Sequence, residues 1–170
     1  MTIPARRPGQ IGLLLLLVFP LFFLPRALLA EDHEIHGIDN RDYEFMFFEP
    51  DFLRFSPGDS VTFVVAHFDP KPQSVFIPDG AEHWQVQNGE TLTITLEQEG
   101  VYLFDCFYHN VMGMAGVIVV GDPDNADEAA RFFAEYRVET FAMNRDRLDH
   151  IWDPDNGALA RRGESREKQP

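Results

Sequence analysis

Residues 101–120 read VYLFDCFYHNVMGMAGVIVV, and the fold prediction for this chain starts from them. Two apolar runs, 101–104 and 116–120, have the length and the β-branched and aromatic content typical of buried strands. The residues between them must connect two adjacent core strands. This connection carries a thiol at Cys106, an imidazole at His109 and a thioether at Met114, so three potential metal-binding side chains share one loop.

The same strand pattern extends over residues 34–120. Short runs rich in Val, Ile, Thr and Phe are separated by Pro and Gly, which favours an all-β domain. The run 60–66 follows the turn residues Pro57, Gly58 and Asp59, and the run 91–96 alternates apolar and hydroxyl side chains as a half-buried strand does. We therefore predict one β-domain over residues 31–122.

A change in composition after residue 122 predicts short C-terminal helices over residues 123–153. Asn125 is expected to cap the first helix, with Glu128 three residues later. An apolar stripe at helical spacing is expected to pack against the β-domain, and it consists of Ala129, Phe132, Phe133 and Tyr136. A second helix is predicted around 138–151, and residues 154–170 form a polar tail that is expected to be disordered.

The amino terminus predicts export. Arg6 and Arg7 precede an apolar stretch over 11–24 that is shorter than the roughly 20 residues needed to span a bilayer. Ala30 suits the position before a signal-peptidase cut, so residues 1–30 are interpreted as a signal peptide and the mature chain as a periplasmic protein that does not span the membrane. An uncleaved anchor and a twin-arginine signal are the alternatives.

The chain is strongly acidic. Its 170 residues have a formal net charge of −14, and without residues 1–30 there remain 11 basic and 28 acidic side chains, a formal charge of −17. This balance excludes binding to a phosphate backbone, so nucleic acid is not an expected partner. It fits an adaptation to high salt, attraction of a basic partner, or simple solubility.

The chemistry of the loop indicates a metal site. A single cysteine, Cys106, excludes an intrachain disulfide, a zinc ribbon and a paired-cysteine redox motif. Thiolate, imidazole and thioether are the soft and borderline ligands that copper prefers, and a type 1 copper site combines two imidazoles and a thiolate with a weak axial methionine. The alternative is that Cys106 is a small buried hydrophobic residue without reactivity.

Several motifs resemble those of the cupredoxins, and among them the pseudoazurins. The resemblance covers about residues 33–150, and its motifs are Glu34-Ile35-His36, Phe48-Glu49-Pro50, Pro57-Gly58-Asp59-Ser60, Ile77-Pro78-Asp79-Gly80-Ala81-Glu82 and Met112-Gly113-Met114. It implies a Greek-key β-sandwich with C-terminal helices. It also implies that Cys106 and His109 are equatorial copper ligands, Met114 is the axial ligand, and Met112 is not a ligand.

The second imidazole is the main departure from this resemblance. Gln73 stands where the family has its first ligand histidine, and a carboxamide is a poor equatorial donor to copper. His67 is a candidate replacement, because counting by twos from Val61 places it on the expected core face of its strand. The fourth ligand is thus His67 or Gln73, or the site lacks a second imidazole; His83 is the remaining candidate.

The resemblance implies a periplasmic electron-transfer protein that binds one copper ion, cycles it between Cu(I) and Cu(II), and is not an enzyme. Partners are expected to be redox proteins, with a basic c-type cytochrome favoured by the acidic charge, and the chain is expected to be a monomer. The replacement at Gln73 leaves a copper-handling protein with a modified, non-blue site as an alternative. A copper-free β-sandwich used for protein interaction is the third possibility.

Overall fold

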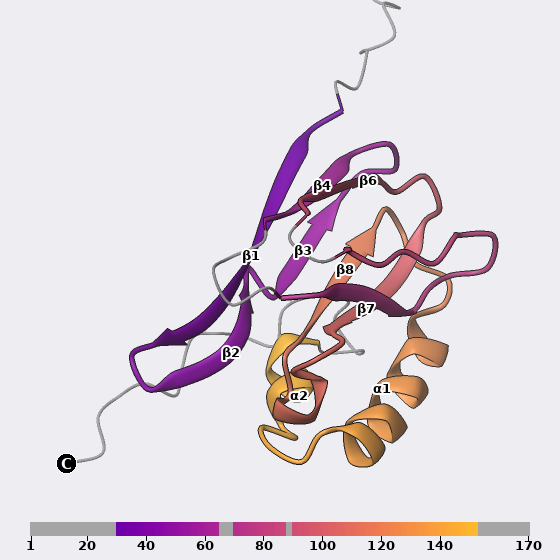
Figure 1. The fold of residues 1–170 in the computed structure, drawn as a ribbon. Helices are drawn as coiled ribbons and strands as arrows, with labels where there is room; N and C mark the ends of the chain where they lie inside the picture. Colours follow the sequence, from indigo (N-terminus) through magenta and orange to yellow (C-terminus); the bar gives the residue numbers. More distant parts are fainter. Residues whose placement is uncertain (1–29, 65–69, 88–89, 153–170) are drawn as a thin grey trace, which may run out of the picture.

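A computed structural model of the chain describes residues 30–64, 70–87 and 90–152. The predicted tail and nearly all of the predicted signal peptide lie outside these residues. Figure 1 shows the arrangement of the elements, which follow one another in the order β1 (Asp32–Arg41), β2 (Glu44–Glu49), β3 (Phe52–Phe55), β4 (Ser60–Val64), β5 (Pro72–Phe76), β6 (Leu92–Thr95), β7 (Gly100–Cys106), η2 (Asn110–Met112), β8 (Ala115–Val120), α1 (Ala126–Thr140) and α2 (Arg147–Ile151).

The strands form two four-stranded sheets that pack face to face. One sheet has the order β2-β1-β4-β6 and the other the order β3-β8-β7-β5. The β1/β4 and β3/β8 pairs are parallel, and the remaining pairs are antiparallel. Neighbouring strands are mostly not consecutive in sequence, as crossovers between two sheets require. The predicted all-β sandwich is confirmed.

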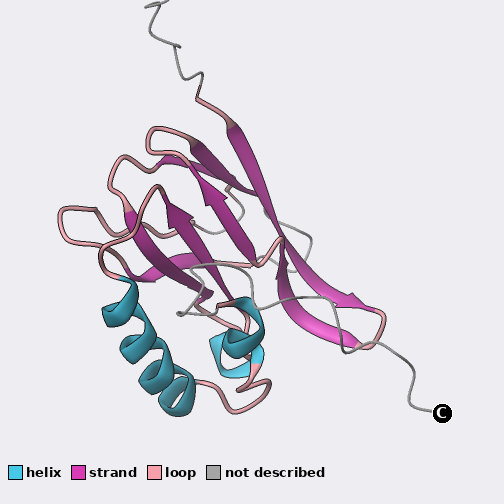
Figure 2. Ribbon diagram, turned by 180° about the vertical axis from the view of Figure 1, so that it is seen from behind, coloured by secondary structure: helices cyan, strands magenta, loops and turns pink. Residues whose placement is uncertain are grey.

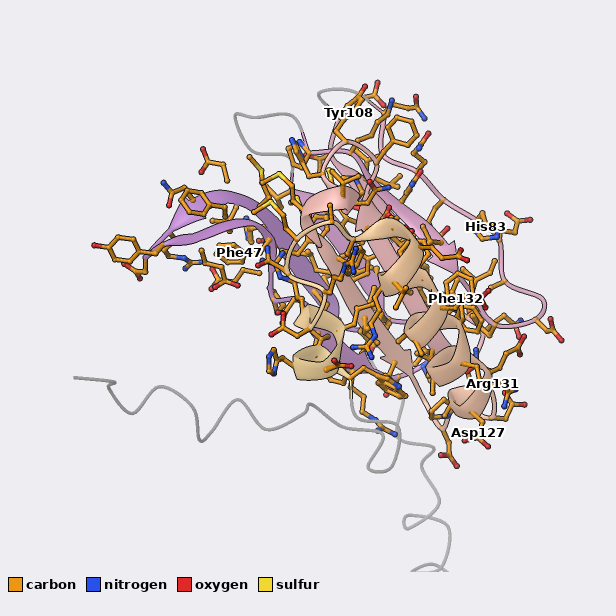
Figure 3. The ribbon with its side chains drawn as sticks, turned by 90° about the horizontal axis from the view of Figure 1, so that it is seen from below. Phe47, His83, Tyr108, Asp127, Arg131 and Phe132 are labelled. Atoms are coloured by element: carbon orange, nitrogen blue, oxygen red, sulfur yellow. The ribbon has the colours of Figure 1, made fainter. Side chains whose placement is uncertain are left out.

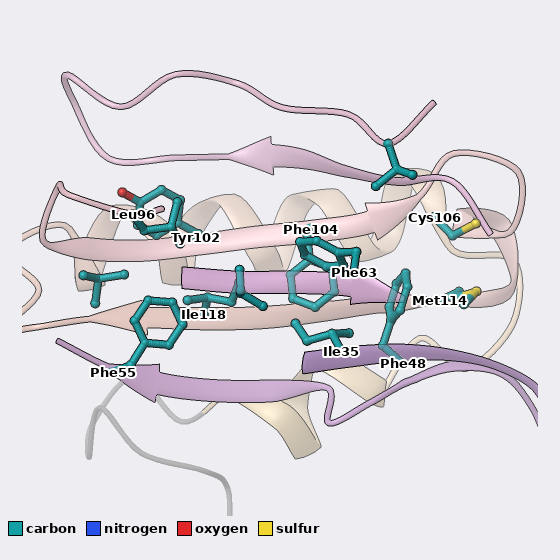
Figure 4. Close-up of a cluster of buried hydrophobic side chains, with 13 residues drawn as sticks. Ile35, Phe48, Phe55, Phe63, Leu96, Tyr102, Phe104, Cys106, Met114 and Ile118 are labelled. Carbon is teal, nitrogen blue, oxygen red and sulfur yellow. The ribbon is translucent and has the colours of Figure 1, made fainter. Parts of the chain in front are cut away.

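The space between the sheets is filled by aromatic and aliphatic side chains. In β4, Val61 and Phe63 are buried while the alternate residue Thr62 is partly exposed and pairs through its hydroxyl with Thr93 over 2.7 Å. The Phe104 ring lies 5.2 Å from that of Phe63. Figure 4 shows Phe63 and Phe104 among the core side chains between the two sheets. The alternation follows from the period of two along a strand.

The helices cover the outer face of the second sheet. Strands β7 and β8 are buried along their whole length, because one face contacts the first sheet and the other contacts the helices. Figure 2 shows both helices on the same side of the sandwich. The aromatic stripe of α1 supplies this contact, with Phe132 lying 5.0 Å and Phe133 6.1 Å from the ring of Phe76. No helix in the described part of the chain combines the length and the hydropathy that a membrane span needs.

Two helix predictions need correction. Asn125 stands at the N-cap position of α1, but its side chain makes no cap hydrogen bond and instead pairs with the main chain of Val101 in β7, over 2.8 Å and 3.2 Å. The predicted second helix over 138–151 is reduced to α2, because α1 extends to Thr140 and residues 141–146 leave the helical conformation. Part of this segment binds the loop between β7 and β8 instead.

Candidate metal centre

The loop between β7 and β8 closes on itself through main-chain hydrogen bonds. The N–H of His109 donates to the Cys106 carbonyl over 3.0 Å, and the N–H of Met114 donates to the His109 carbonyl over 3.3 Å. The N–H of Cys106 donates to the Met114 carbonyl over 2.9 Å. Cys106 is the last residue of β7, and Met114 directly precedes β8. The fold therefore brings all three side chains to one end of the sandwich.

The thiol of Cys106 is fully buried and faces the imidazole of His109. Its Sγ lies 3.3 Å from Nδ1 of His109 and accepts a hydrogen bond from the Lys71 N–H over 3.4 Å. Burial raises the pKa of the Cys106 thiol; main-chain N–H groups, including that of Lys71, oppose this effect, and the Asp105 carboxylate adds to it. A thiolate is the metal-binding form, so a cation bound beside Sγ would favour loss of this proton.

His109 presents its Nδ1 atom to this buried sulfur from the start of the one-turn helix η2. Its side chain is only partly buried, and that burial lowers the pKa of the imidazole. A lowered pKa keeps the ring neutral at pH 7, and neutral imidazole is the form that ligates metals. His109 thus lies between the buried sulfur and the surface.

Met114 places a thioether at the same end of the core. It is fully buried and belongs to the same cluster of core side chains as Cys106. Figure 4 shows the two sulfur atoms at one end of this cluster, with Phe48 beside Met114. A thioether in apolar surroundings is a weak, soft donor.

The donors present fit copper better than a hard cation. Within residues 30–64, 70–87 and 90–152, no three side chains among His, Cys, Asp and Glu are grouped so as to hold a metal. Calcium and magnesium need several oxygen ligands, whereas copper accepts sulfur and imidazole nitrogen. The sulfur atoms of Cys106 and Met114 and the imidazole of His109 are donors of the kind that suits copper.

The side chain of Gln73 is bound to other groups. Its Nε2 donates to Oδ1 of Asp105 over 3.0 Å, and its Oε1 accepts from Nε2 of Gln85 over 2.7 Å. In the β5/β7 ladder Gln73 pairs with Asp105, while Pro72 pairs with Cys106. Successive side chains of a strand point to opposite faces, so the Gln73 carboxamide lies on the opposite side of the sheet from Sγ of Cys106.

The other possible second imidazoles are placed as follows. His67 lies within residues 65–69, outside the described part of the chain. His83 is exposed, and its Nδ1 lies 3.0 Å from Oγ of Ser74. Lys71, whose main-chain N–H donates to the Cys106 sulfur, directly follows Pro70. Pro70 is buried, and its side chain has no atom that could bind a metal.

A buried carboxylate next to Cys106 is a feature that the sequence prediction missed. Asp105 is fully buried and accepts hydrogen bonds from Gln73 of β5 and from the Tyr136 hydroxyl of α1. Burial raises the pKa of Asp105, and these two donors oppose the rise. A charged residue inside the apolar run VYLFDC was the signal for this contact. The bonds join the strand that ends at Cys106 to both β5 and α1.

Large apolar side chains that lie close to His109 in sequence are exposed on the outside of the loop. Phe107, Tyr108 and Val111 are each about half exposed, and Tyr108 projects outward in Figure 3. The Lys71 ammonium lies 5.9 Å from the Phe107 ring and 5.6 Å from the Tyr108 ring. We call these four residues, Lys71 included, the loop rim.

Comparison with known proteins identifies the family. A family model described as copper binding proteins, plastocyanin/azurin family, matches residues 36–121. The chain belongs to this family. Pseudoazurin of Paracoccus pantotrophus is 35% identical to this cupredoxin over 103 residues, which cover 59% of this chain and 71% of that one. Pseudoazurin of Methylorubrum extorquens strain AM1 is 32% identical over 131 residues, covering 76% of this chain and 84% of that one.

Solved structures agree with this assignment. The refined crystal structure of pseudoazurin from Methylobacterium extorquens AM1 superimposes with a TM-score of 0.60 at 29% sequence identity, covering 69% of this chain and 94% of that one. The cupredoxin is thus pseudoazurin-like, its cofactor is copper, and it belongs to the electron-transfer class.

Proposed function

We propose that this cupredoxin is a periplasmic electron carrier that cycles one copper ion between Cu(I) and Cu(II), with Cys106, His109 and Met114 as ligands. The observation that carries the proposal is the 3.3 Å approach of Cys106 Sγ to His109 Nδ1, at the end of the core where the Met114 sulfur also lies. Bound copper supplies a one-electron couple. The protein would pass electrons between partners rather than transform a substrate.

The chain's own residues would hold this site rigid and dry. The three main-chain hydrogen bonds that close the loop would fix the spacing of the three proposed ligands whether the copper is oxidised or reduced. The Lys71 N–H stabilises the charge of the thiolate, and the apolar shell around Met114 excludes water. Little rearrangement would then accompany electron transfer.

The loop rim is the proposed contact surface for partners. His109 is the least buried of the three proposed ligand residues, and the half-exposed rings of Phe107 and Tyr108 directly precede it in the chain. A partner that docks on these rings would come near the imidazole, so the electron would leave through His109. Electron-transfer encounters typically bury little surface, and a small apolar contact would release readily, as a shuttle requires.

The acidic charge favours a basic partner, for which a c-type cytochrome is the proposal. The chain has a net charge of −14, and opposite charges on the partner would speed the encounter. We expect the association rate with a basic cytochrome to fall as ionic strength rises, measured by stopped-flow reduction. A rate that does not change with salt would contradict this steering.

The proposed function is tested by loading the protein with Cu(II) and recording copper content and visible absorption. We expect one copper per chain and an intense thiolate-to-copper band. If His67 is the second imidazole, His67→Ala abolishes the band, whereas Gln73→Ala retains it because that carboxamide is bound to Asp105 and Gln85. One copper without the band would contradict the blue-copper proposal and indicate a copper-handling site; no copper would contradict both.

A further inference from the structure

The segment between the two C-terminal helices is hydrogen-bonded to the metal-binding loop. Three successive loop carbonyls, those of residues 111–113, all accept hydrogen bonds from residues 142–147. The bonds are Ala142 N–H to Val111 O (2.8 Å), Met143 N–H to Val111 O (3.1 Å), Asn144 Nδ2 to Met112 O (2.8 Å) and Arg147 Nη1 to Gly113 O (2.8 Å). Residues 111–113 directly precede Met114. We call the four residues that donate these bonds, Ala142, Met143, Asn144 and Arg147, the C-terminal clamp.

Arg147 connects the clamp to the loop and to β2 through side-chain hydrogen bonds. Its side chain is only 8% exposed, and besides Gly113 it donates to the carbonyls of Met46 over 2.7 Å and Phe45 over 3.4 Å. Its Nη2 atom also forms an ion pair with Oε1 of Glu44 over 3.7 Å. Burying a guanidinium costs free energy unless its N–H groups are hydrogen-bonded. Because the acceptors of Arg147 belong to β2 and the loop, its side chain fixes α2 relative to both.

The clamp and the loop also pack closely. Gly113 has a positive φ of 76°, and a Cβ added there would lie 3.1 Å from Asn144 Cβ and from the carbonyl oxygens of Met143 and Asn144. Such contacts are tighter than ordinary van der Waals separation. The loop main chain before Met114 therefore lies against the clamp with too little room for a larger side chain at Gly113.

We propose that the C-terminal clamp positions the loop main chain at residues 111–113, and so sets the distance between the Met114 sulfur and the copper. The inference rests on the proposed function, in which Met114 is the axial ligand. An axial thioether bond to copper is long and weak, so the protein fixes its length more than the metal does, and that length tunes the reduction potential. Asn144 and Arg147 are thus positioning residues.

The first test uses the metal-free protein and so does not depend on copper. The amides of Met112, Gly113 and Met114 are hydrogen-bonded inside the loop, and their hydrogen exchange reports its opening. We expect Asn144→Gly to speed their exchange about tenfold, which corresponds to 1.4 kcal/mol, the upper range for one hydrogen bond. Glycine tolerates the positive φ of 49° at this exposed residue, so the change removes the donor without adding strain.

Two further variants complete the set. Arg147→Met is expected to loosen the loop more, and Asn144→Gly carries the test if Arg147→Met does not fold. Arg145→Met is the matched control, because Arg145 belongs to the same segment but its Nε donates to Phe141. The control should leave the exchange of the three loop amides unchanged. Exchange that is equal in Asn144→Gly and the control would overturn the proposal.

The second test measures the copper-loaded variants. We expect Asn144→Gly to keep one copper per chain but to shift the midpoint potential and the visible spectrum, with no such shift in Arg145→Met. A loosened loop with an unchanged potential would overturn the link to Met114. Met114→Gln tests the axial ligand separately from the clamp. If this variant leaves the spectrum and the potential unchanged, the assignment of Met114 as axial ligand fails. The exchange of the loop amides still decides whether the clamp holds the loop.

Discussion

Cys106→Ser is expected to abolish the intense visible band of the copper-loaded protein and to weaken copper binding by more than the 10- to 100-fold typical of changes in outer contacts. The band requires a thiolate bonded to Cu(II), and Cys106 is the chain's single cysteine. A serine hydroxyl is a hard donor that stays protonated in this site, where burial already raises the pKa of the thiol. Copper titration followed by absorption would measure both effects.

The control must show that the loop itself survives. Met112→Leu changes a thioether in the same loop that the resemblance assigns no bond to copper, so it should keep both the band and the copper stoichiometry. Circular dichroism of the metal-free Cys106→Ser protein would show whether the fold tolerates a buried hydroxyl. A folded Cys106→Ser protein that retained the intense band would refute the assignment of Cys106 as a ligand.

The sequence predicted the strands near the loop because their hydrophobic pattern is local. The runs 60–66, 91–96, 101–104 and 116–120 correspond to β4, β6, β7 and β8. The loop was predictable for the same reason, since its side chains follow one another within nine residues. The structure adds that main-chain hydrogen bonds close this loop.

Contacts between distant residues were not predictable from the pattern. Asn125 has the sequence features of a helix cap, yet its side chain pairs with Val101, 24 residues earlier. The residues after Thr140 have helical character in sequence, but several donate to the loop, more than 30 residues earlier. Tertiary hydrogen bonds outweighed local propensity at both places.

The register of β5 decides whether Gln73 or its neighbour lies on the same face of the sheet as Cys106. A shift of one residue moves every side chain of a strand to the other face. In the structure Pro72 stands opposite Cys106, which puts Gln73 beside Asp105. The sequence alone contains no signal that distinguishes these two registers.

Phe104→Ala is expected to lower the free energy of unfolding by about 3–5 kcal/mol, a large part of the roughly 5–15 kcal/mol of a typical domain. Phe104 is fully buried, and its ring lies 5.0 Å from that of Phe48 and 6.2 Å from that of Trp84. The Phe104 ring packs directly against Gly116 of β8, because a Cβ added at Gly116 would lie only 2.3 Å from Phe104 Cζ. Urea unfolding of the metal-free protein measures the loss.

The matched control is Val138→Ala, which trims a side chain that is 61% exposed and should change the free energy by less than about 0.5 kcal/mol. A loss at Phe104 as small as in this control would contradict its place at the centre of the core.

Copper adds a second measurement, because a ligand that binds only the folded state stabilises it by an amount set by its affinity. Phe104 and Cys106 are two residues apart and share the inner face of β7, so the cavity left by alanine should also weaken copper binding. Copper should therefore stabilise Phe104→Ala less than it stabilises the wild type.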